Sequence, residues 1–236
     1  FLIANILCII FLAGCNKSDK IPVSNKETQT QKEFIWQPVV NLTNGNESTP
    51  ELSESCIGAS GDTLHMVYSG YFDNRHKSFL LYRNSTDGGT TWSAERKLLS
   101  IKRDIFMPKV AVSGPLVIIA WNGGENFKSQ IFIKRSTDGG VNWEDDAALT
   151  PENIRASTPN LAISENNVYL AWTEEKFVDF YAGKMDRKPF LKISRNGGKD
   201  WGNDIQVVNN LIEGKFVLAA SGKNVYLTWV DKTEKE

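Results

Sequence analysis

The chain has 236 residues, of which 41% are hydrophobic, so it is long enough to form one large domain with its own core. Its formal net charge is −1, and the 27 basic and 28 acidic residues are interspersed along the chain. This balance argues against a nucleic-acid-binding protein, which needs a basic excess, and against a disordered chain.

Residues 1–15 have the pattern of an export signal. Residues 1–12 are almost entirely apolar, which is too short for a membrane-spanning helix but fits the apolar core of a secretory signal. They end in Leu12-Ala13-Gly14-Cys15, which resembles the lipobox of bacterial lipoproteins. The resemblance implies cleavage before Cys15, lipidation of its thiol, and a membrane-anchored protein that faces the periplasm or the cell surface. A plain signal peptide followed by an unrelated cysteine is the alternative.

Residues 16–33 are polar and poor in large apolar side chains, which predicts a flexible linker between the lipid anchor and a folded domain. Cys8 lies in the signal and Cys15 at the lipobox, so Cys56 has no partner for an intramolecular disulfide. We expect Cys56 to be a small strand residue rather than a reactive thiol.

Residues 34–236 contain one short pattern three times. The tryptophans that end the three copies follow one another at intervals of 51 and 58 residues, which suits one propeller blade of four short strands. The Asp or Asn oxygen can accept backbone hydrogen bonds of a turn, and the glycines allow positive φ. The alternating acidic ligands of a calcium loop are missing. The repeated residues are Ser85, Asp87, Gly89 and Trp92; Ser136, Asp138, Gly140 and Trp143; and Ser194, Asn196, Gly198 and Trp201.

Apolar strands precede each copy in the same order. The runs at residues 64–68, 117–121, 168–172 and 225–229 are nearly all apolar and end in an aromatic residue, as expected for strands covered on both faces. We therefore predict an all-β fold, a β-propeller of four-stranded antiparallel blades. We name the strands of a blade A to D from the centre outward, with the repeated turn between C and D.

Turns of the Ser-x-Asp-x-Gly-x-x-Trp type, placed after such strands, resemble the Asp-box (bacterial neuraminidase) repeats of the sialidase superfamily. The resemblance covers about residues 34 to 231 and implies the propeller fold. In that family an arginine cluster holds the sugar carboxylate, a Tyr paired with a Glu is the nucleophile, and an Asp is the acid/base. The Arg-Ile-Pro segment of the family is absent here, where the chain reads Phe34-Ile35-Trp36-Gln37-Pro38, and no Tyr is marked by a motif. The resemblance therefore implies the fold more specifically than the activity.

The predicted strand order places the B–C and D–A loops on one face and the A–B loops with the repeated turns on the other. A ligand is expected on the first face, around the central channel, so the repeated turns are structural. Loop arginines there can bind a carboxylate in bidentate fashion, although solvated loop charges are the alternative. Candidate ligand-binding residues are Arg75, Arg103 and Arg155, and candidate catalytic residues are Asp104, Glu174 and Tyr181, while Asp73 and Glu175 lie in the same loops.

No metal or cofactor site is predicted. His65 occupies a strand position and His76 stands alone in a loop, so the spacing suggests no third zinc ligand. The chain has no glycine-rich phosphate loop and no nucleophile elbow.

These features predict a surface-anchored, sialidase-like propeller that recognises a glycan or a cell-surface protein. An exo-sialidase or related glycoside hydrolase and a non-catalytic assembly scaffold are the alternatives. Residues 34–42 resemble a D strand without its own A, B and C strands, and residues 225–229 resemble the B strand of a fourth unit. We therefore expect a fragment of a propeller of about six blades. A compact ring of four blades is the alternative.

Overall fold

The computed structural model describes residues 42, 51–72, 77–101, 104–125, 128–179 and 184–231. The predicted signal (1–15), the linker (16–33) and most of the 34–42 segment lie outside these residues. Within them every regular element is a β-strand. No helix of the described residues is long and apolar enough to cross a membrane.

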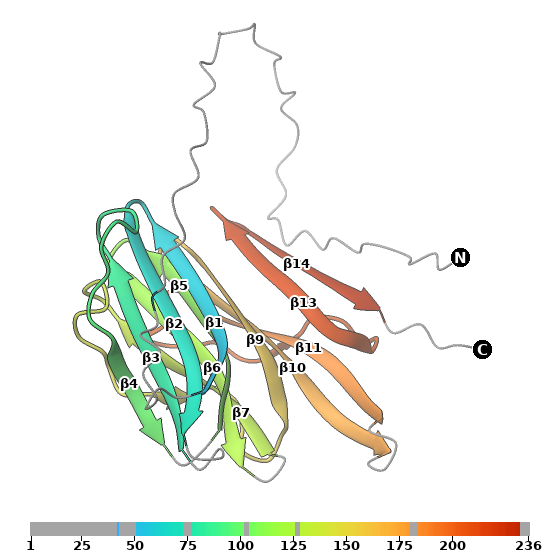
Figure 1. Ribbon diagram of the computed structural model, residues 1–236. Coiled ribbons are helices and arrows are strands. Elements are labelled where there is room, and N and C mark those ends of the chain that lie inside the picture. Colours follow the sequence, from blue (N-terminus) through green and yellow to red (C-terminus); the bar gives the residue numbers. More distant parts are fainter. Residues whose placement is uncertain are drawn as a thin grey trace, which may run out of the picture.

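The strands form antiparallel sheets that follow one another along the chain, and Figure 1 shows these sheets in order from blue to red. Each sheet pairs its strands in sequence order, as the propeller prediction requires, and the predicted fold class is confirmed. Blade 1 has β1 (Glu51–Ser60), β2 (Thr63–Phe72), β3 (Lys77–Ser85) and β4 (Arg96–Ile101). Blade 2 has β5 (Asp104–Ser113), β6 (Leu116–Glu125), β7 (Lys128–Ser136) and β8 (Ala147–Ala148). Blade 3 has β9 (Ala156–Ser164), β10 (Asn167–Asp179), β11 (Lys184–Ser194) and β12 (Ile205–Gln206), and blade 4 has β13 (Ile212–Ser221) and β14 (Asn224–Asp231).

The hydrophobic core lies in layers between successive blades. In β6 the run from Val117 to Trp121 is buried along its whole length, because blades 1 and 3 cover its two faces. Trp172 takes the same place in blade 3 and stacks on Phe190, with ring centroids 5.8 Å apart. The continuous apolar runs in the sequence thus correspond to strands that are buried on both sides.

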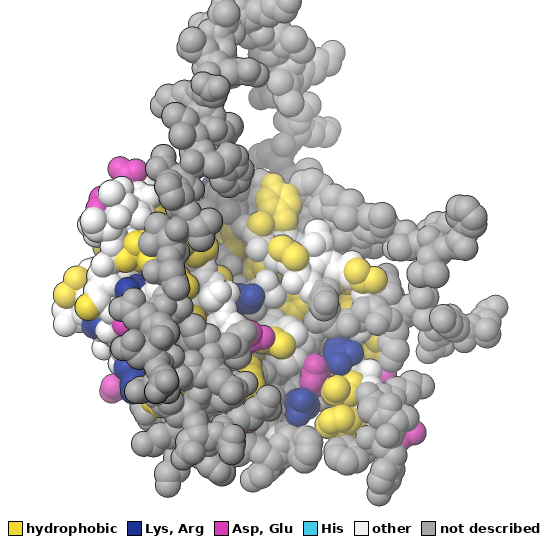
Figure 2. Space-filling view, in the orientation of Figure 1, with side chains coloured by type: hydrophobic (Ala, Val, Ile, Leu, Met, Phe, Trp, Pro, Cys, Tyr) yellow, Lys and Arg dark blue, Asp and Glu magenta, His cyan; other side chains and the backbone are white. Residues whose placement is uncertain are grey.

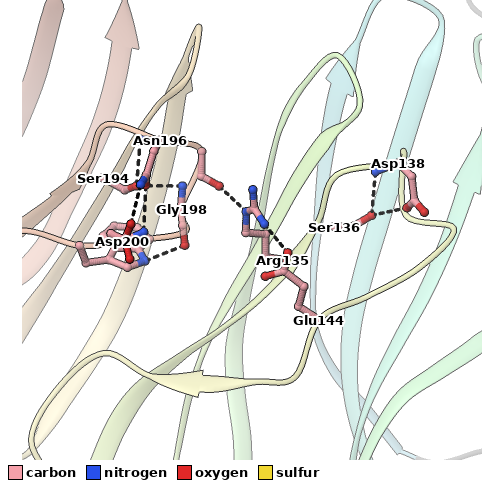
Figure 3. Close-up of polar contacts among 10 residues, drawn as sticks. Arg135, Ser136, Asp138, Glu144, Ser194, Asn196, Gly198 and Asp200 are labelled. Atoms are coloured by element: carbon pink, nitrogen blue, oxygen red, sulfur yellow. Dashed lines mark hydrogen bonds and ion pairs between the residues drawn. The ribbon is translucent and has the colours of Figure 1, made fainter.

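The repeated turns are held by one hydrogen-bond pattern, and Figure 3 shows two of the three copies. In the second copy Ser136 Oγ donates to Asp138 Oδ1 (2.8 Å) and accepts from the Gly140 N–H (2.9 Å). Asp138 Oδ1 also accepts from the Asn142 N–H (2.9 Å). Asn196 replaces the aspartate in the third copy and its Oδ1 accepts from the Asp200 N–H at the same distance. An amide oxygen therefore fills the acceptor position as a carboxylate does.

The repeated C–D turns and the A–B turns lie at the same ends of the strands, and therefore on the same face of the propeller. The backbone N–H of Gly88 donates to Asp62 O, that of Gly139 to Pro115 O, and that of Gly197 to Asn166 O, each at 2.8 Å. The B–C and D–A connections therefore lie at the opposite ends of the strands. We call that end of the molecule the ligand face.

Arginines tie the turns of blades 2 and 3 to the preceding blade. Arg96 of β4 donates to Gly140 O (2.6 Å) and Val141 O (3.0 Å), both in the turn of blade 2. Arg135 of β7 donates through Nε to Gly197 O (2.6 Å) in the turn of blade 3 and forms an ion pair with Glu144 (Figure 3). These contacts couple blade 1 to blade 2 and blade 2 to blade 3.

Candidate functional site

The ligand face carries a cluster of charged side chains at the end of blade 3. Arg155 Nε donates to one oxygen of Glu175 (2.8 Å) and Arg187 Nε to the other (3.1 Å). The Glu175 side chain is only 7% exposed, whereas each arginine side chain is 29% exposed. Burial would raise the pKa of Glu175, but hydrogen bonds from Arg155, Ser157 and Arg187 outweigh it and lower the pKa. We call Arg155, Glu175 and Arg187 the Arg155 cluster, and its carboxylate is ionised at neutral pH.

The backbone around Arg155 is fixed by the two neighbouring sheets. Asn122 Nδ2 of β6 and Ser129 Oγ of β7 both donate to Ala156 O, each at 2.7 Å. The Glu175 N–H donates to Arg155 O at 2.8 Å. The backbone at Arg155 is thus held between blades 2 and 3.

A chain of hydroxyl groups leads from the cluster towards the first strand of blade 3. Thr173 is completely buried, and its Oγ1 lies 2.9 Å from Ser157 Oγ and 2.8 Å from Thr158 Oγ1. Ser157 also hydrogen-bonds Glu175. The cluster and β9 therefore belong to one polar network at the ligand face.

The hairpin of β10 and β11 extends further than the sequence predicts. Residues 173–188 read as a long loop, but β10 continues to Asp179 and β11 starts at Lys184. Directly opposite residues carry opposite charges, with Glu174 facing Lys188 and Lys176 facing Asp186. Such cross-strand pairs stabilise two paired strands even where the sequence does not alternate between apolar and polar residues. The sequence pattern therefore does not reveal these strand extensions, and the prediction of a loop was wrong.

Side chains of the hairpin complete the surroundings of Arg155. The Arg155 guanidinium carbon lies 5.5 Å from the centre of the Phe177 ring, within the range of a cation–π contact. Figure 2 shows basic and acidic side chains next to one another, among hydrophobic ones, where Figure 1 has β10 and β11. Arg187 and Phe177 are absent from the sequence-based candidates, because only the hairpin register places them beside Arg155.

Two of the other candidates, Glu174 and Asp104, lie in the described residues but are not part of this cluster. Glu174 neighbours Glu175 along β10, so its side chain points to the opposite face of the sheet. Burial and the charge of Asp204 raise the pKa of Glu174, and Lys188 opposes that shift. Asp104 is the first residue of β5 rather than a loop residue, and it pairs with Gly124 in blade 2. Arg75, Arg103 and Tyr181 lie outside the described residues.

Metal ligands do not gather in the described part of the chain. No group of three or more His, Cys, Asp or Glu residues there could hold an ion. His65 is a fully buried residue of β2 whose Nδ1 lies 2.6 Å from the Tyr82 hydroxyl. Burial lowers the pKa of His65, in keeping with a neutral core residue.

No protein-family model and no curated protein match this chain. Among solved structures it is similar to a Trypanosoma rangeli sialidase, with a TM-score of 0.55, 11% identity, and coverage of 77% of this chain and 35% of that one. It is also similar to the α-L-arabinofuranosidase Arb93A of Fusarium graminearum (TM-score 0.51, 14% identity, 66% and 49% covered). The Penicillium chrysogenum α-L-arabinanase gives the same TM-score with 12% identity and the same coverage. This chain thus spans about half the length of the arabinofuranosidase and of the arabinanase. The likeness shows that it shares the β-propeller fold of these structures.

Proposed function

We propose that this protein is an exported, lipid-anchored propeller that binds a carboxylated glycan at its ligand face. The observation that carries the proposal is the Arg155 cluster, where two partly exposed arginines share one buried carboxylate. The cluster itself contains two guanidinium groups and one carboxylate. A guanidinium has five N–H donors, so Arg187 can hold Glu175 through Nε and still donate to a ligand carboxylate.

Two similar structures support a sugar ligand. A Trypanosoma rangeli sialidase of this fold is known in complex with sialic acid, and the Penicillium chrysogenum arabinanase in complex with arabinobiose. Sialic acid carries a carboxylate, which suits an arginine pair better than a neutral sugar does. Fold alone does not fix function, so the two arginines of the cluster are our reason for proposing a carboxylated sugar rather than a neutral one.

Isothermal titration of the complete protein with α2,3-sialyllactose and with lactose tests the proposal. We expect binding of the sialylated sugar only, and a loss of about tenfold or more in affinity for Arg187→Met, since a charge-assisted contact disappears. Arg195→Met removes an exposed arginine outside the cluster and is the matched control. Equal binding of both sugars, or equal effects of the two variants, would overturn the proposal.

The alternative is an exo-sialidase, and the raised pKa of Glu174 is the observation that favours proton-transfer chemistry on this blade. Hydrolysis of a fluorogenic sialoside by the complete protein separates the two functions. Binding without turnover supports a recognition protein. Turnover that is lost in Glu174→Gln supports the hydrolase.

The anchoring part of the proposal rests on Leu12-Ala13-Gly14-Cys15. We expect the mature chain to begin at Cys15 and to carry lipid on that residue. Mass spectrometry of the native protein checks the terminus, and Cys15→Ser is expected to leave the membrane fraction. A mature N-terminus elsewhere, or a Cys15→Ser variant that stays with membranes, would contradict the proposal.

A further inference from the structure

The first strands of the blades bulge at the same level, near the ligand face. The pairing register shifts between Leu52 and Glu54 in β1, between Phe106 and Lys109 in β5, and between Ser157 and Asn160 in β9. In blades 1 to 3 the first strand ends in a serine, and the residue six positions before it is Glu54, Met107 or Thr158. We call these three residues the bulge positions: Met107 and Thr158 lie within the bulge, whereas Glu54 lies beside it and pairs with Ser69 of β2.

The backbone of the first strands is uniform between blades at the A–B end but not at the ligand face. At the A–B end, the residue after the final serine has φ between 55° and 59° in all four blades and is Gly61, Gly114, Glu165 or Gly222. At the bulge positions Met107 and Thr158 share a left-handed φ that Glu54 does not adopt, and the three side chains carry a carboxylate, a thioether and a hydroxyl.

Backbone strain marks two of these positions. Met107 has φ 51° and Thr158 has φ 52°, a left-handed conformation that non-glycine residues rarely adopt. Strained residues of this kind gather at functional sites, where the surrounding structure holds them in place. The Met107 side chain is 36% exposed. An apolar side chain on this face offers a surface to the C–H groups of a sugar ring.

Glu54 links two adjacent bulge positions. Its Oε2 accepts the backbone N–H of Met107 in the next blade. Thr158 has nearly the same φ as Met107. In the blade before Thr158 the residue that corresponds to Glu54 is Met107, which has no carboxylate. The bulge therefore forms without an acidic neighbour, and a need for backbone stability does not account for the carboxylate at residue 54.

We propose that Glu54 is a ligand-contacting residue that accepts hydrogen bonds from hydroxyl groups of the bound sugar. A carboxylate has about four acceptor positions, and the Met107 N–H uses one oxygen. That contact orients the carboxylate before a ligand arrives, which reduces the entropy lost on binding. The inference rests on the proposed function, because Glu54 would hold the hydroxyls of the sugar whose carboxylate the Arg155 cluster binds.

The test compares Glu54→Gln with the parent by titration of α2,3-sialyllactose into the complete protein. An amide can still accept the Met107 N–H, but it loses the charge that strengthens hydroxyl contacts. We expect affinity to fall about tenfold while the thermal unfolding midpoint stays at the parental value. Asp62→Asn removes a carboxylate from the A–B turn at the other end of blade 1 and should change neither quantity.

If Glu54→Gln binds within twofold of the parental affinity while Arg187→Met binds weakly, the role of Glu54 is overturned. The proposed function then still stands. A loss of affinity that comes only with a lowered unfolding midpoint would also overturn the role of Glu54, since this residue would then act on the fold. No binding by the parent protein would overturn the proposed function and this inference together.

Discussion

Tyr82 sets the tightest steric limit among the glycines of the repeated turns. A Cβ on Gly140 would lie 2.0 Å from the Tyr82 hydroxyl and 2.8 Å from its ring, whereas a Cβ on Gly139 would meet no atom within 4 Å. Tyr82 itself is fully buried and its ring meets Trp143 edge to face, with centroids 5.2 Å apart. Desolvation raises the pKa of Tyr82 to about 12, so the hydroxyl stays protonated. The turn of blade 2 thus closes directly over a side chain of blade 1.

Gly139→Ala and Gly140→Ala form a matched pair that separates backbone strain from steric overlap. Both glycines have positive φ, so each substitution should cost about 1–2 kcal/mol of unfolding free energy. Only Gly140→Ala must also displace Tyr82, which should add about 1–3 kcal/mol. Urea unfolding at pH 7 measures both values. Equal losses would show that the Tyr82 contact has no energetic weight.

At the scale of single elements, the three repeated turns differ in the group that accepts the backbone hydrogen bonds. In the first turn Thr91 donates to Asp87 through both its hydroxyl (2.6 Å) and its backbone N–H (2.8 Å). These contacts, with one from Ser85, lower the pKa of Asp87 to about 2. Hydrogen bonds from Asn142 likewise lower the pKa of Asp138. Asn196 carries no charge, so in the third turn the acceptor of the backbone hydrogen bond does not titrate, and the carboxylate of that turn is Asp200, whose Oδ2 accepts from Asn196 Nδ2 (2.8 Å).

Acid should therefore weaken the first turn in a defined pH window. A carboxylate whose pKa is lowered by folding stabilises the folded state above its unfolded pKa, and this contribution disappears as the pH falls to the folded value. We expect the parent to exceed Asp87→Asn in stability at pH 7, and the gap to close between about pH 4 and about pH 2. Urea midpoints across this range measure the gap.

Asp62→Asn is the control for that series, since the Asp62 backbone carbonyl, not its side chain, binds Gly88. Its stability difference from the parent should not follow the same curve. A gap for Asp87→Asn that persists unchanged at pH 2 would contradict the link between the Asp87 hydrogen bonds and its pKa.

Element by element, the sequence predicts blades 1 to 3 well because the second strand of each is marked by a long apolar run and each C–D connection by a repeated turn. The hairpin of β10 and β11 has neither signal, since its outer part is built from charged pairs such as Lys176 and Asp186. Arg155 could be selected by its place in a D–A connection. Arg187 could not, because a strand register must be known before the partner of Glu175 can be named.

For the molecule as a whole, the contacts between blades decide whether the sheets unfold together. Arg96 and Arg135 donate to backbone carbonyls of the next turn, and Trp143 packs on Tyr82 across the same boundary. Lys192 Nζ of blade 3 donates to Leu149 O of blade 2 at 2.9 Å. Polar and apolar contacts thus cross the same boundaries, which favours one cooperative transition over separate unfolding of each blade.

Arg96→Lys tests this coupling. A lysine ammonium cannot reproduce the planar fork that reaches Gly140 O and Val141 O together. We expect a loss of about 1 kcal/mol in unfolding free energy. Arg195→Lys alters an exposed arginine within the third turn and should be close to neutral. Urea unfolding measures both variants, and equal losses would show that the Arg96 fork does not couple blades 1 and 2.

The tryptophans of the repeated turns give blades 1 to 3 one optical reporter each. Trp92, Trp143 and Trp201 each donate the indole N–H to a glycine carbonyl of their own turn, at 3.1, 3.0 and 3.0 Å. Trp121 and Trp172, by contrast, are at most 1% exposed. Opening of a turn breaks its indole hydrogen bond and exposes that ring to water, which shifts fluorescence emission to the red. Three variants that keep one turn tryptophan each, with phenylalanine at the other two, can therefore time the opening of the turns of blades 1 to 3, with one stopped-flow experiment for each variant.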